Sequence, residues 1–211
     1  MKRPSVLLAD DHRLFTDALA NNLRKDFELV GTAHDGKMML DLTRQLRPDV
    51  LITDISMPLL NGIDAARIIH KEVPSTRIVF ITMHSDTPIV EEALNAGAAG
   101  FLVKLGNIEE LVEAVHTVAS GKTYITPIIA GDVMSTLITN RSHKRVAKTE
   151  LSSRQRHLLQ LLAEGKTMKE AAEVMNISTR TAESHKYEIM RKLSVETTAA
   201  LIRYAVKTKL V

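Results

Sequence analysis

Four short apolar runs in the first half of the sequence end in residues that can act on a phosphoryl group. The residues at or just after these ends are Asp10, Asp11, Asp54, Thr82 and Lys104. The carboxyl ends of parallel strands share one edge of a sheet, where ligands bind. If the four runs are neighbouring parallel strands, three carboxylates, a hydroxyl and an ammonium group lie close together.

Such a cluster suits phosphoryl transfer to an aspartate. Three acids together favour a hard divalent cation such as Mg²⁺, which takes oxygen ligands and keeps some of its waters. Lys104 and Thr82 can then hold phosphoryl oxygens that the metal also touches. Taken singly, an acid at a strand end is an ordinary turn or cap residue and a lysine is ordinary surface. Their recurrence at four strand ends favours the functional interpretation.

Composition sets the class of protein. The 211 residues, 45% of them hydrophobic, suffice for one large or two modest domains. No cysteine is present, which excludes disulfides and thiolate metal sites. The start of the sequence lacks the long apolar core typical of a signal peptide, and no apolar run approaches membrane-spanning length, so we expect a soluble, cytoplasmic protein.

Charge is divided unevenly along the chain. Residues 1–140 carry 13 Lys and Arg against 18 Asp and Glu, whereas residues 141–211 carry 15 against 7. An acidic front and a basic back predict two domains with different partners, the second facing a polyanion.

Up to about residue 120, β-rich runs alternate with longer amphipathic segments. Strands are predicted near 5–10, 28–33, 49–54, 77–82 and 100–103. Helices are predicted near 13–25, 36–46, 62–73, 88–97 and 107–119. This alternation predicts an α/β fold with a doubly wound, five-stranded parallel sheet.

The remainder divides into a connector and a helical region. Residues 121–150 are predicted to be an interdomain linker with some helix between 128 and 138. From Leu151 onward the pattern is all helical, with four helices. Their ends are marked by two capping boxes, a C-cap glycine and a left-handed turn residue, namely Ser152 with Gln155, Thr167 with Glu170, Gly165 and Asn176.

Two segments add specific signals to the strand-end residues. One is DISMPLLNG at 54–62, and the other is GAAGFLVK at 97–104. With the acids in this order, residues 4–120 resemble the flavodoxin-like receiver domain of bacterial two-component response regulators. The first segment is similar to the family's phosphoacceptor loop, and the second to the segment carrying its switch aromatic and its lysine.

The resemblance implies roles for these residues. Asp54 would accept a phosphoryl group from a sensor histidine kinase, with Lys104 pairing with a phosphoryl oxygen. Asp11, Asp54 and the backbone carbonyl of Ser56 would bind Mg²⁺ directly, and Asp10 would act through a bound water. The receiver would catalyse only its own phosphorylation and dephosphorylation, so the chain is not expected to be an enzyme.

The resemblance also implies a switch. Thr82 would swing to bond the phosphoryl group, which leaves space into which Phe101 can turn. That rearrangement would reshape the face made by the fourth helix, the fifth strand and the fifth helix.

The second half resembles the LuxR/NarL-type helix-turn-helix domain over residues 151–208. Its third helix, from about Ser178 to Leu193, is predicted to pack inward through Ala182, His185, Ile189 and Leu193. His185 is expected to be a packed, hydrogen-bonded residue rather than a base contact. The candidate DNA-binding residues are Thr179, Arg180, Thr181, Glu183, Ser184, Lys186, Tyr187 and Lys192. Among them, Glu183, Ser184 and Tyr187 are expected at base edges, and Thr181, Lys186 and Lys192 at phosphates.

The leading hypothesis is therefore a phosphorylation-dependent transcriptional regulator that binds double-stranded DNA and dimerises when phosphorylated or DNA-bound. One alternative is a DNA-binding regulator that acts independently of phosphorylation. Another is a phosphatase of the haloacid-dehalogenase kind, which also uses an aspartate nucleophile and Mg²⁺. That family has a general acid two residues after its nucleophile, whereas Ser56 stands two residues after Asp54 here.

Overall fold

The computed structural model describes residues 3–83, 87–104, 107–127, 129–131 and 151–207. The chain divides into two compact units. The first comprises residues 1–57 and 62–144, and the second comprises residues 145–211 with the short segment 58–61. No helix in the described ranges is long and apolar enough to cross a membrane.

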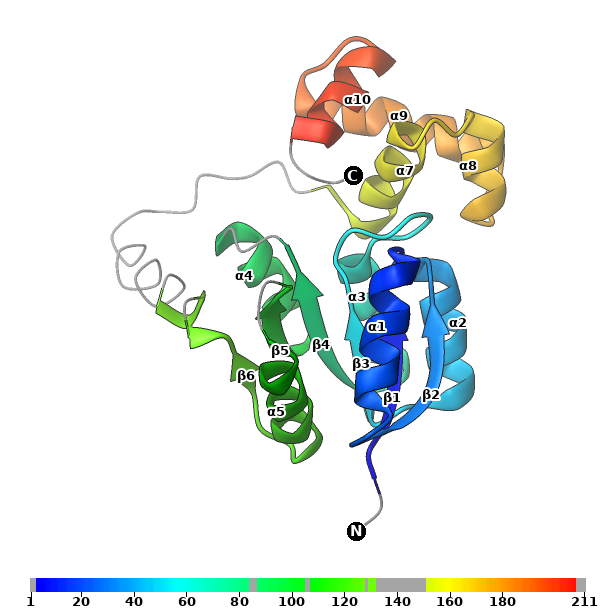
Figure 1. Cartoon of the computed structure of the whole chain (residues 1–211). Coiled ribbons are helices and arrows are strands. Elements are labelled where there is room, and N and C mark those ends of the chain that lie inside the picture. The colour runs from blue at the N-terminus through cyan, green and yellow to red at the C-terminus, as the bar shows by residue number, and fades with distance from the viewer. Residues whose placement is uncertain (1–2, 84–86, 105–106, 128, 132–150, 208–211) are drawn as a thin grey trace. The chain divides into compact units, whose positions relative to one another are not determined.

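The first unit is built on a parallel sheet (Figure 1). Its strands are β1 (Ser5–Ala9), β2 (Glu28–Ala33), β3 (Val50–Thr53), β4 (Arg77–Thr82), β5 (Ala98–Val103) and β6 (Tyr124–Ile125). They lie in the order β2-β1-β3-β4-β5-β6, and every pair is parallel. The order changes direction next to β1, so the carboxyl ends of β1 and β3 flank the position where such sheets bind ligands.

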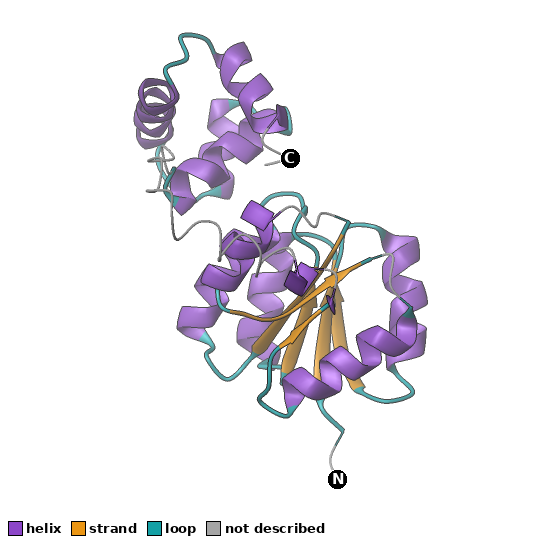
Figure 2. Cartoon of the chain, turned by 90° about the vertical axis from the view of Figure 1, so that its left-hand side faces the viewer, coloured by secondary structure: helices purple, strands orange, loops and turns teal. Residues whose placement is uncertain are grey.

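Helices cover both faces of this sheet (Figure 2). They are α1 (Arg13–Leu23), α2 (Gly36–Leu46), α3 (Gly62–Glu72), α4 (Thr87–Asn95) and α5 (Ile108–Ala119). α1 and α5 pack on one face through a single apolar cluster that includes alternate residues of the central strands, such as Val6, Leu8, Val50 and Ile52. Strands covered on both faces are apolar throughout, which explains the continuous hydrophobic runs in the sequence.

The doubly wound parallel sheet is confirmed, but the predicted number of strands is wrong. A sixth strand, β6, pairs with β5 at the edge, with Gly100 opposite Tyr124 and Phe101 opposite Ile125. It has only two residues and lies in the segment predicted to be a linker. The sequence therefore contains no apolar run of strand length from which β6 could be predicted. Of the helix predicted between 128 and 138, positions 129–131 are helical, and the other positions lie outside the described residues.

Residues 151–207 of the second unit form helices joined by short turns, as predicted. Its helices are α7 (Ser153–Ala163), α8 (Met168–Val174), α9 (Thr179–Leu193) and α10 (Thr198–Lys207). Buried residues from all four form one apolar cluster, including Leu158, Ala171, Ile189 and Leu201.

The predicted helix ends of this unit are confirmed. Both capping boxes are formed, at the start of α7 and at the start of α8. Gly165 and Asn176 have positive φ angles of 85° and 52° at the two following turns.

Candidate functional site

Backbone hydrogen bonds continue past the strand ends and hold the predicted site residues in line. The amide of Asp54 donates to the carbonyl of Ala9 at 2.9 Å, and the amide of Lys104 donates to the carbonyl of Thr82 at the same distance. The amide of Asp10 bonds in the same way to the last residue of β2. The sheet thus places the predicted cluster at one edge.

Lys104 links two of the acids. Its Nζ lies 2.6 Å from Oδ2 of Asp10 and 2.5 Å from Oδ2 of Asp54. The second oxygen of Asp54, Oδ1, accepts from the amide of Ile55 at 2.6 Å. The side chains of Lys104, Asp10 and Asp54 are 7%, 0% and 6% exposed. A buried ammonium group is therefore shared between two buried carboxylates.

Burial and hydrogen bonding act in opposite directions on the pKa values of Asp54 and Lys104. Removal from water raises the pKa of Asp54 above its ordinary value, and the hydrogen bond from Lys104 offsets only part of that rise. For Lys104, burial lowers the pKa, but hydrogen bonds to Asp10 and Asp54 outweigh it and leave the pKa raised. Lys104 is therefore held in its cationic form, which suits a group that pairs with an anion.

The acids also form a candidate cation site. Asp10, Asp11, His12 and Asp54 each offer a ligand atom, and these atoms lie within 4.8 Å of one another. Three carboxylates are a donor set that fits Mg²⁺. His12 was not predicted, although it follows the acidic pair directly in the sequence. Its Nδ1 lies 2.9 Å from Oδ1 of Asp11. The predicted role of the Ser56 carbonyl stays a prediction.

The loop after Asp54 returns close to it. The amide of Gly62 donates to the carbonyl of Ile55 at 2.8 Å. A Cβ atom at position 62 would lie 2.0 Å from the carbonyl oxygen of Asp54. Because real side chains never approach a backbone that closely, glycine is required here, which accounts for the glycine at the end of the phosphoacceptor-like segment.

Thr82 and Phe101 are both fully buried. Phe101 lies opposite Phe80 of the neighbouring strand, and the two ring centroids are 6.4 Å apart. The Phe101 ring is already buried in this structure, so it has no need of a space opening next to Thr82 before it can turn inward. The switch role of Phe101 stays a prediction.

In the second unit, α9 has the predicted inner face. Ala182 and Ile189 are buried, and Leu193 packs against the apolar cluster. His185 is packed there too, but the prediction that it is hydrogen-bonded is wrong. Both its ring nitrogens are buried without a hydrogen-bond partner in the described part of the chain, and Nδ1 lies 3.8 Å from Oε2 of Glu188. The buried side chain of Gln155, on α7, forms hydrogen bonds with Glu188 and Lys192 of α9 instead.

The outer side of α9 carries the candidate DNA-binding residues. All of them are exposed except Lys186, which is half-buried. The Nζ of Lys186 lies 4.8 Å from the ring centroid of Tyr187. Ser184 donates to the carbonyl of Arg180 at 3.1 Å, and Lys192 donates to Oε1 of Gln155 at 2.9 Å. The helix therefore presents polar and cationic groups on the surface opposite its packed face.

Two known protein families match this chain, one in each half. Residues 6–116 match the response regulator receiver domain, and residues 149–205 match the bacterial regulatory proteins of the luxR family. The chain belongs to the LuxR-type response regulators. Both the receiver resemblance and the helix-turn-helix resemblance are thereby confirmed.

Relatives of similar length share both domains. The transcriptional regulatory protein MctR of Rhizobium johnstonii is 37% identical over 202 residues, which cover 95% of this chain and 92% of MctR. The oxygen regulatory protein NreC of Staphylococcus carnosus is 35% identical, and the match covers 97% of this chain and 98% of NreC.

Solved structures of full-length response regulators are also similar to this chain. The RcsB response regulator of Salmonella typhimurium is 28% identical, with a TM-score of 0.66 and coverage of 98% of each chain. A structure of an RcsB–DNA complex matches with a TM-score of 0.59 and 28% identity, covering 97% of this chain and 98% of that one. A receiver domain joined to a LuxR-type DNA-binding domain makes this response regulator a transcription factor.

Proposed function

We propose that this response regulator is switched by phosphorylation of Asp54 by a sensor histidine kinase. The observation that carries the proposal is the position of Lys104, whose Nζ lies within 2.6 Å of both Asp10 and Asp54. A cation held there meets the oxygens of a phosphoryl group arriving at Asp54. Residues 4–120 are the proposed receiver, 121–150 the linker and 151–208 the DNA-binding domain.

In the proposed step, a carboxylate oxygen of Asp54 attacks the phosphorus of the kinase's phosphohistidine. The P–O bond to Asp54 forms as the P–N bond breaks, and the imidazole leaves. Lys104 pairs with a phosphoryl oxygen, and the hydroxyl of Thr82 bonds another. Positioning and electrostatics supply most of the catalysis in phosphoryl transfer, and these residues provide both.

The carboxylates of Asp10, Asp11 and Asp54, with the Ser56 carbonyl, are the proposed holders of Mg²⁺. When bound, the ion neutralises charge on the transferring phosphoryl group. The acids supply the oxygen ligands, and Lys104 balances part of their negative charge.

The output is a change in DNA binding. The added phosphoryl group brings negative charge and acceptor oxygens next to Thr82 and Lys104. We propose that the altered receiver surface promotes a homodimer, which places two α9 helices in successive major grooves of double-stranded DNA. Of the outer residues, Glu183, Ser184 and Tyr187 are the proposed base-edge contacts, with Thr179 and Arg180 beside them.

The first test is a measurement of mass. The full-length protein is incubated with Mg²⁺ and phosphoramidate, and the mass of the intact chain is followed. Wild type is expected to gain one phosphoryl group, and Asp54→Ala none. Asp17→Asn, which alters an exposed acid on α1, serves as the control and is expected to match wild type. An equal gain in Asp54→Ala would overturn the assignment of the acceptor.

The second test separates phosphorylation-dependent from phosphorylation-independent regulation. Binding sites are selected from random double-stranded DNA, and the affinity for them is then measured for wild type, phosphorylated wild type and Asp54→Ala. The proposal predicts tighter binding by the phosphorylated protein alone. Equal affinities for all three would show a regulator that acts independently of phosphorylation.

A further inference from the structure

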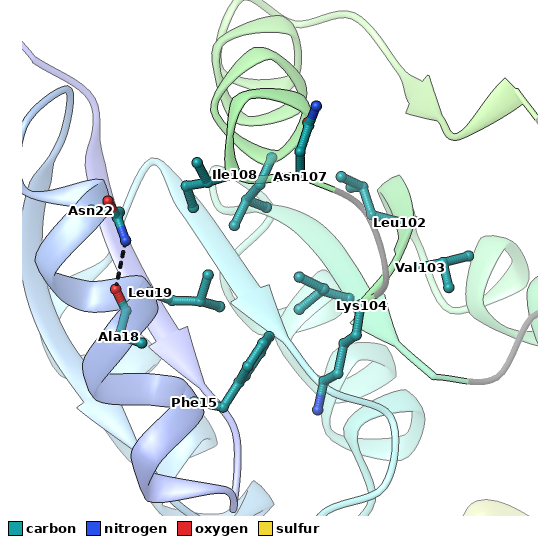
Figure 3. A pocket seen from close by; sticks show the side chains of 11 residues that line it. Phe15, Ala18, Leu19, Asn22, Leu102, Val103, Lys104, Asn107 and Ile108 are labelled. Carbon is teal, nitrogen blue, oxygen red and sulfur yellow. Dashed lines mark hydrogen bonds between the residues drawn. The ribbon is translucent and has the colours of Figure 1, made fainter.

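The aromatic ring of Phe15 lies against the ammonium group of Lys104. Phe15 belongs to the first turn of α1, and its ring centroid is 4.9 Å from Nζ of Lys104. Figure 3 shows the two side chains side by side, one from α1 and the other from the segment after β5. This distance is within the range of a cation–π interaction, in which the negative face of the ring attracts the cation.

The surroundings of this ammonium group make the contact with the ring strong. The Lys104 side chain is only 7% exposed, so little water remains to solvate its charge. Its charged neighbours in the described ranges are Asp10 and Asp54. A cation–π contact is stronger when the cation is desolvated. A lysine also has a flexible four-carbon stem that does not fix its ammonium group by itself.

An apolar pocket borders the ring and the lysine stem. It has a volume of about 170 Å³ and lies between α1, the ends of β4 and β5, and α5 (Figure 3). Leu19, Ile81 and Leu102 contribute to its walls, together with Phe15 and Lys104. A smaller side chain at position 15 would enlarge this pocket next to Lys104. The ring therefore both contacts the cation and fills space beside it.

We propose that Phe15 is a positioning residue for phosphoryl transfer. Its ring holds the Lys104 ammonium group next to the position that the incoming phosphoryl oxygen will take. This inference rests on the proposed function of Asp54. With phosphoramidate as donor, an Asp54 oxygen attacks phosphorus, the P–N bond breaks, and the already protonated nitrogen leaves as ammonia. Lys104 offsets the charge on the transferring oxygens. Without the ring, its ammonium group occupies more positions, and fewer encounters find it in place.

The test compares rings of equal shape but different charge distribution. The full-length protein with Mg²⁺ is treated with phosphoramidate, and the rate of mass gain is measured for wild type, Phe15→Leu, Phe15→Tyr and Phe15→pentafluorophenylalanine. Loss of the cation–π contact is expected to slow Phe15→Leu by about 2- to 30-fold. Phe15→Tyr keeps the negative ring face and is expected to stay within about twofold of wild type.

The pentafluorinated ring separates positioning from packing. It fills nearly the same space, but fluorine withdraws electrons and reverses the charge of the ring face, so it repels the ammonium group. We expect it to be as slow as Phe15→Leu, while its melting temperature stays near that of wild type. A residue that only packs would give a different result, with the pentafluorinated variant as fast as wild type and the leucine variant slow.

Phe27→Leu is the matched control. Phe27 is 2% exposed, and its ring packs against His116 with centroids 4.6 Å apart, away from Lys104. It should lower the melting temperature without changing the rate of mass gain. If wild type gains mass at Asp54 and all the Phe15 variants match it, the role of Phe15 is overturned while the proposed function stands. If wild type gains no mass, the proposed function itself fails.

Discussion

The amide nitrogen of Lys104 donates a hydrogen bond to the carbonyl oxygen of Thr82 at 2.9 Å. This bond extends the pairing of β4 and β5 by one step beyond their ends, so the backbone holds Thr82 and Lys104, which carry the hydroxyl and the ammonium group of the site, next to each other. A substitution of either side chain leaves this bond in place. Variants at the two positions therefore test side-chain chemistry rather than the position of the strands.

The first prediction concerns Thr82. In Thr82→Ala the backbone bond and the acids remain, so Asp54 should still be phosphorylated. Loss of the hydroxyl removes a hydrogen bond to a charged group, worth about 1.5–3 kcal/mol. The gain in DNA affinity on phosphorylation should fall by about tenfold or more. Thr82→Ser should restore it. Equal gains in wild type and Thr82→Ala, measured by DNA titration, would contradict the role of the hydroxyl.

The second prediction concerns Lys104. Lys104→Met removes the cation paired with Asp10 and Asp54 and should slow phosphorylation by about 100-fold, the cost of losing one electrostatic stabiliser of a transition state. Lys104→Arg keeps the charge but changes its geometry, so we expect partial activity. The measurement is the rate of mass gain with phosphoramidate. A Lys104→Met rate within about twofold of wild type would remove this residue from the mechanism.

Much of the fold follows from the sequence because its signals are periodic and local. The five predicted strands and the predicted helix ends depend on apolar runs and capping residues that act within a few positions, as at Ser152 and Gly165. β6 could not be predicted in this way. A two-residue strand carries no period, and its pairing is decided by the edge that β5 leaves open.

The candidate site likewise contains some contacts that the sequence predicts and others that it does not. Asp10, Asp54 and Lys104 could be predicted to meet because parallel strands bring their ends to one edge. The contact between Phe15 and Lys104 could not, because an aromatic residue on an amphipathic helix is ordinary core in sequence terms. The lack of a hydrogen-bond partner for the His185 ring within the described ranges could not be predicted either, since the sequence does not show which residues face it.

The third prediction concerns the effect of the buried Asp54 carboxylate on the stability of the folded protein. Burial raises the pKa of Asp54, so the folded protein binds this proton more tightly than the unfolded chain. The stabilising contribution is therefore present at low pH and is lost as the pH rises through the raised pKa. At neutral pH without Mg²⁺, Asp54→Asn should raise the melting temperature by a few degrees.

Addition of Mg²⁺ should reverse the order of the melting temperatures of wild type and Asp54→Asn. A ligand that binds only the folded state stabilises it, so wild type should gain melting temperature with Mg²⁺ and Asp54→Asn should gain much less. Asp17→Asn, with its exposed acid, is the control and should follow wild type in both conditions. A Mg²⁺-induced rise of equal size in Asp54→Asn would exclude Asp54 from the cation site.

The fourth prediction concerns Gly62. A Cβ atom there would lie 2.0 Å from the Asp54 carbonyl oxygen, so Gly62→Ala must displace the loop or the strand end. We expect a loss of about 2 kcal/mol or more in the free energy of unfolding, with slower phosphorylation. Gly131→Ala is the control, because nothing lies within 4 Å of its Cβ position. Comparable denaturation midpoints for the two variants would show that the close approach is not maintained in solution.

The last prediction separates the two kinds of DNA contact proposed for α9. Lys186 is expected to meet a phosphate, so Lys186→Met should weaken binding to all sequences and reduce the salt slope of log affinity by about one. Glu183 is expected at a base edge, so Glu183→Gln should relax the preference at one base pair at a cost of about 1–3 kcal/mol on the selected site. It should leave affinity for unrelated DNA nearly unchanged. Titrations of selected and scrambled duplexes over a salt series measure both effects, and a Lys186→Met loss confined to the selected duplex would place that lysine among the base contacts instead.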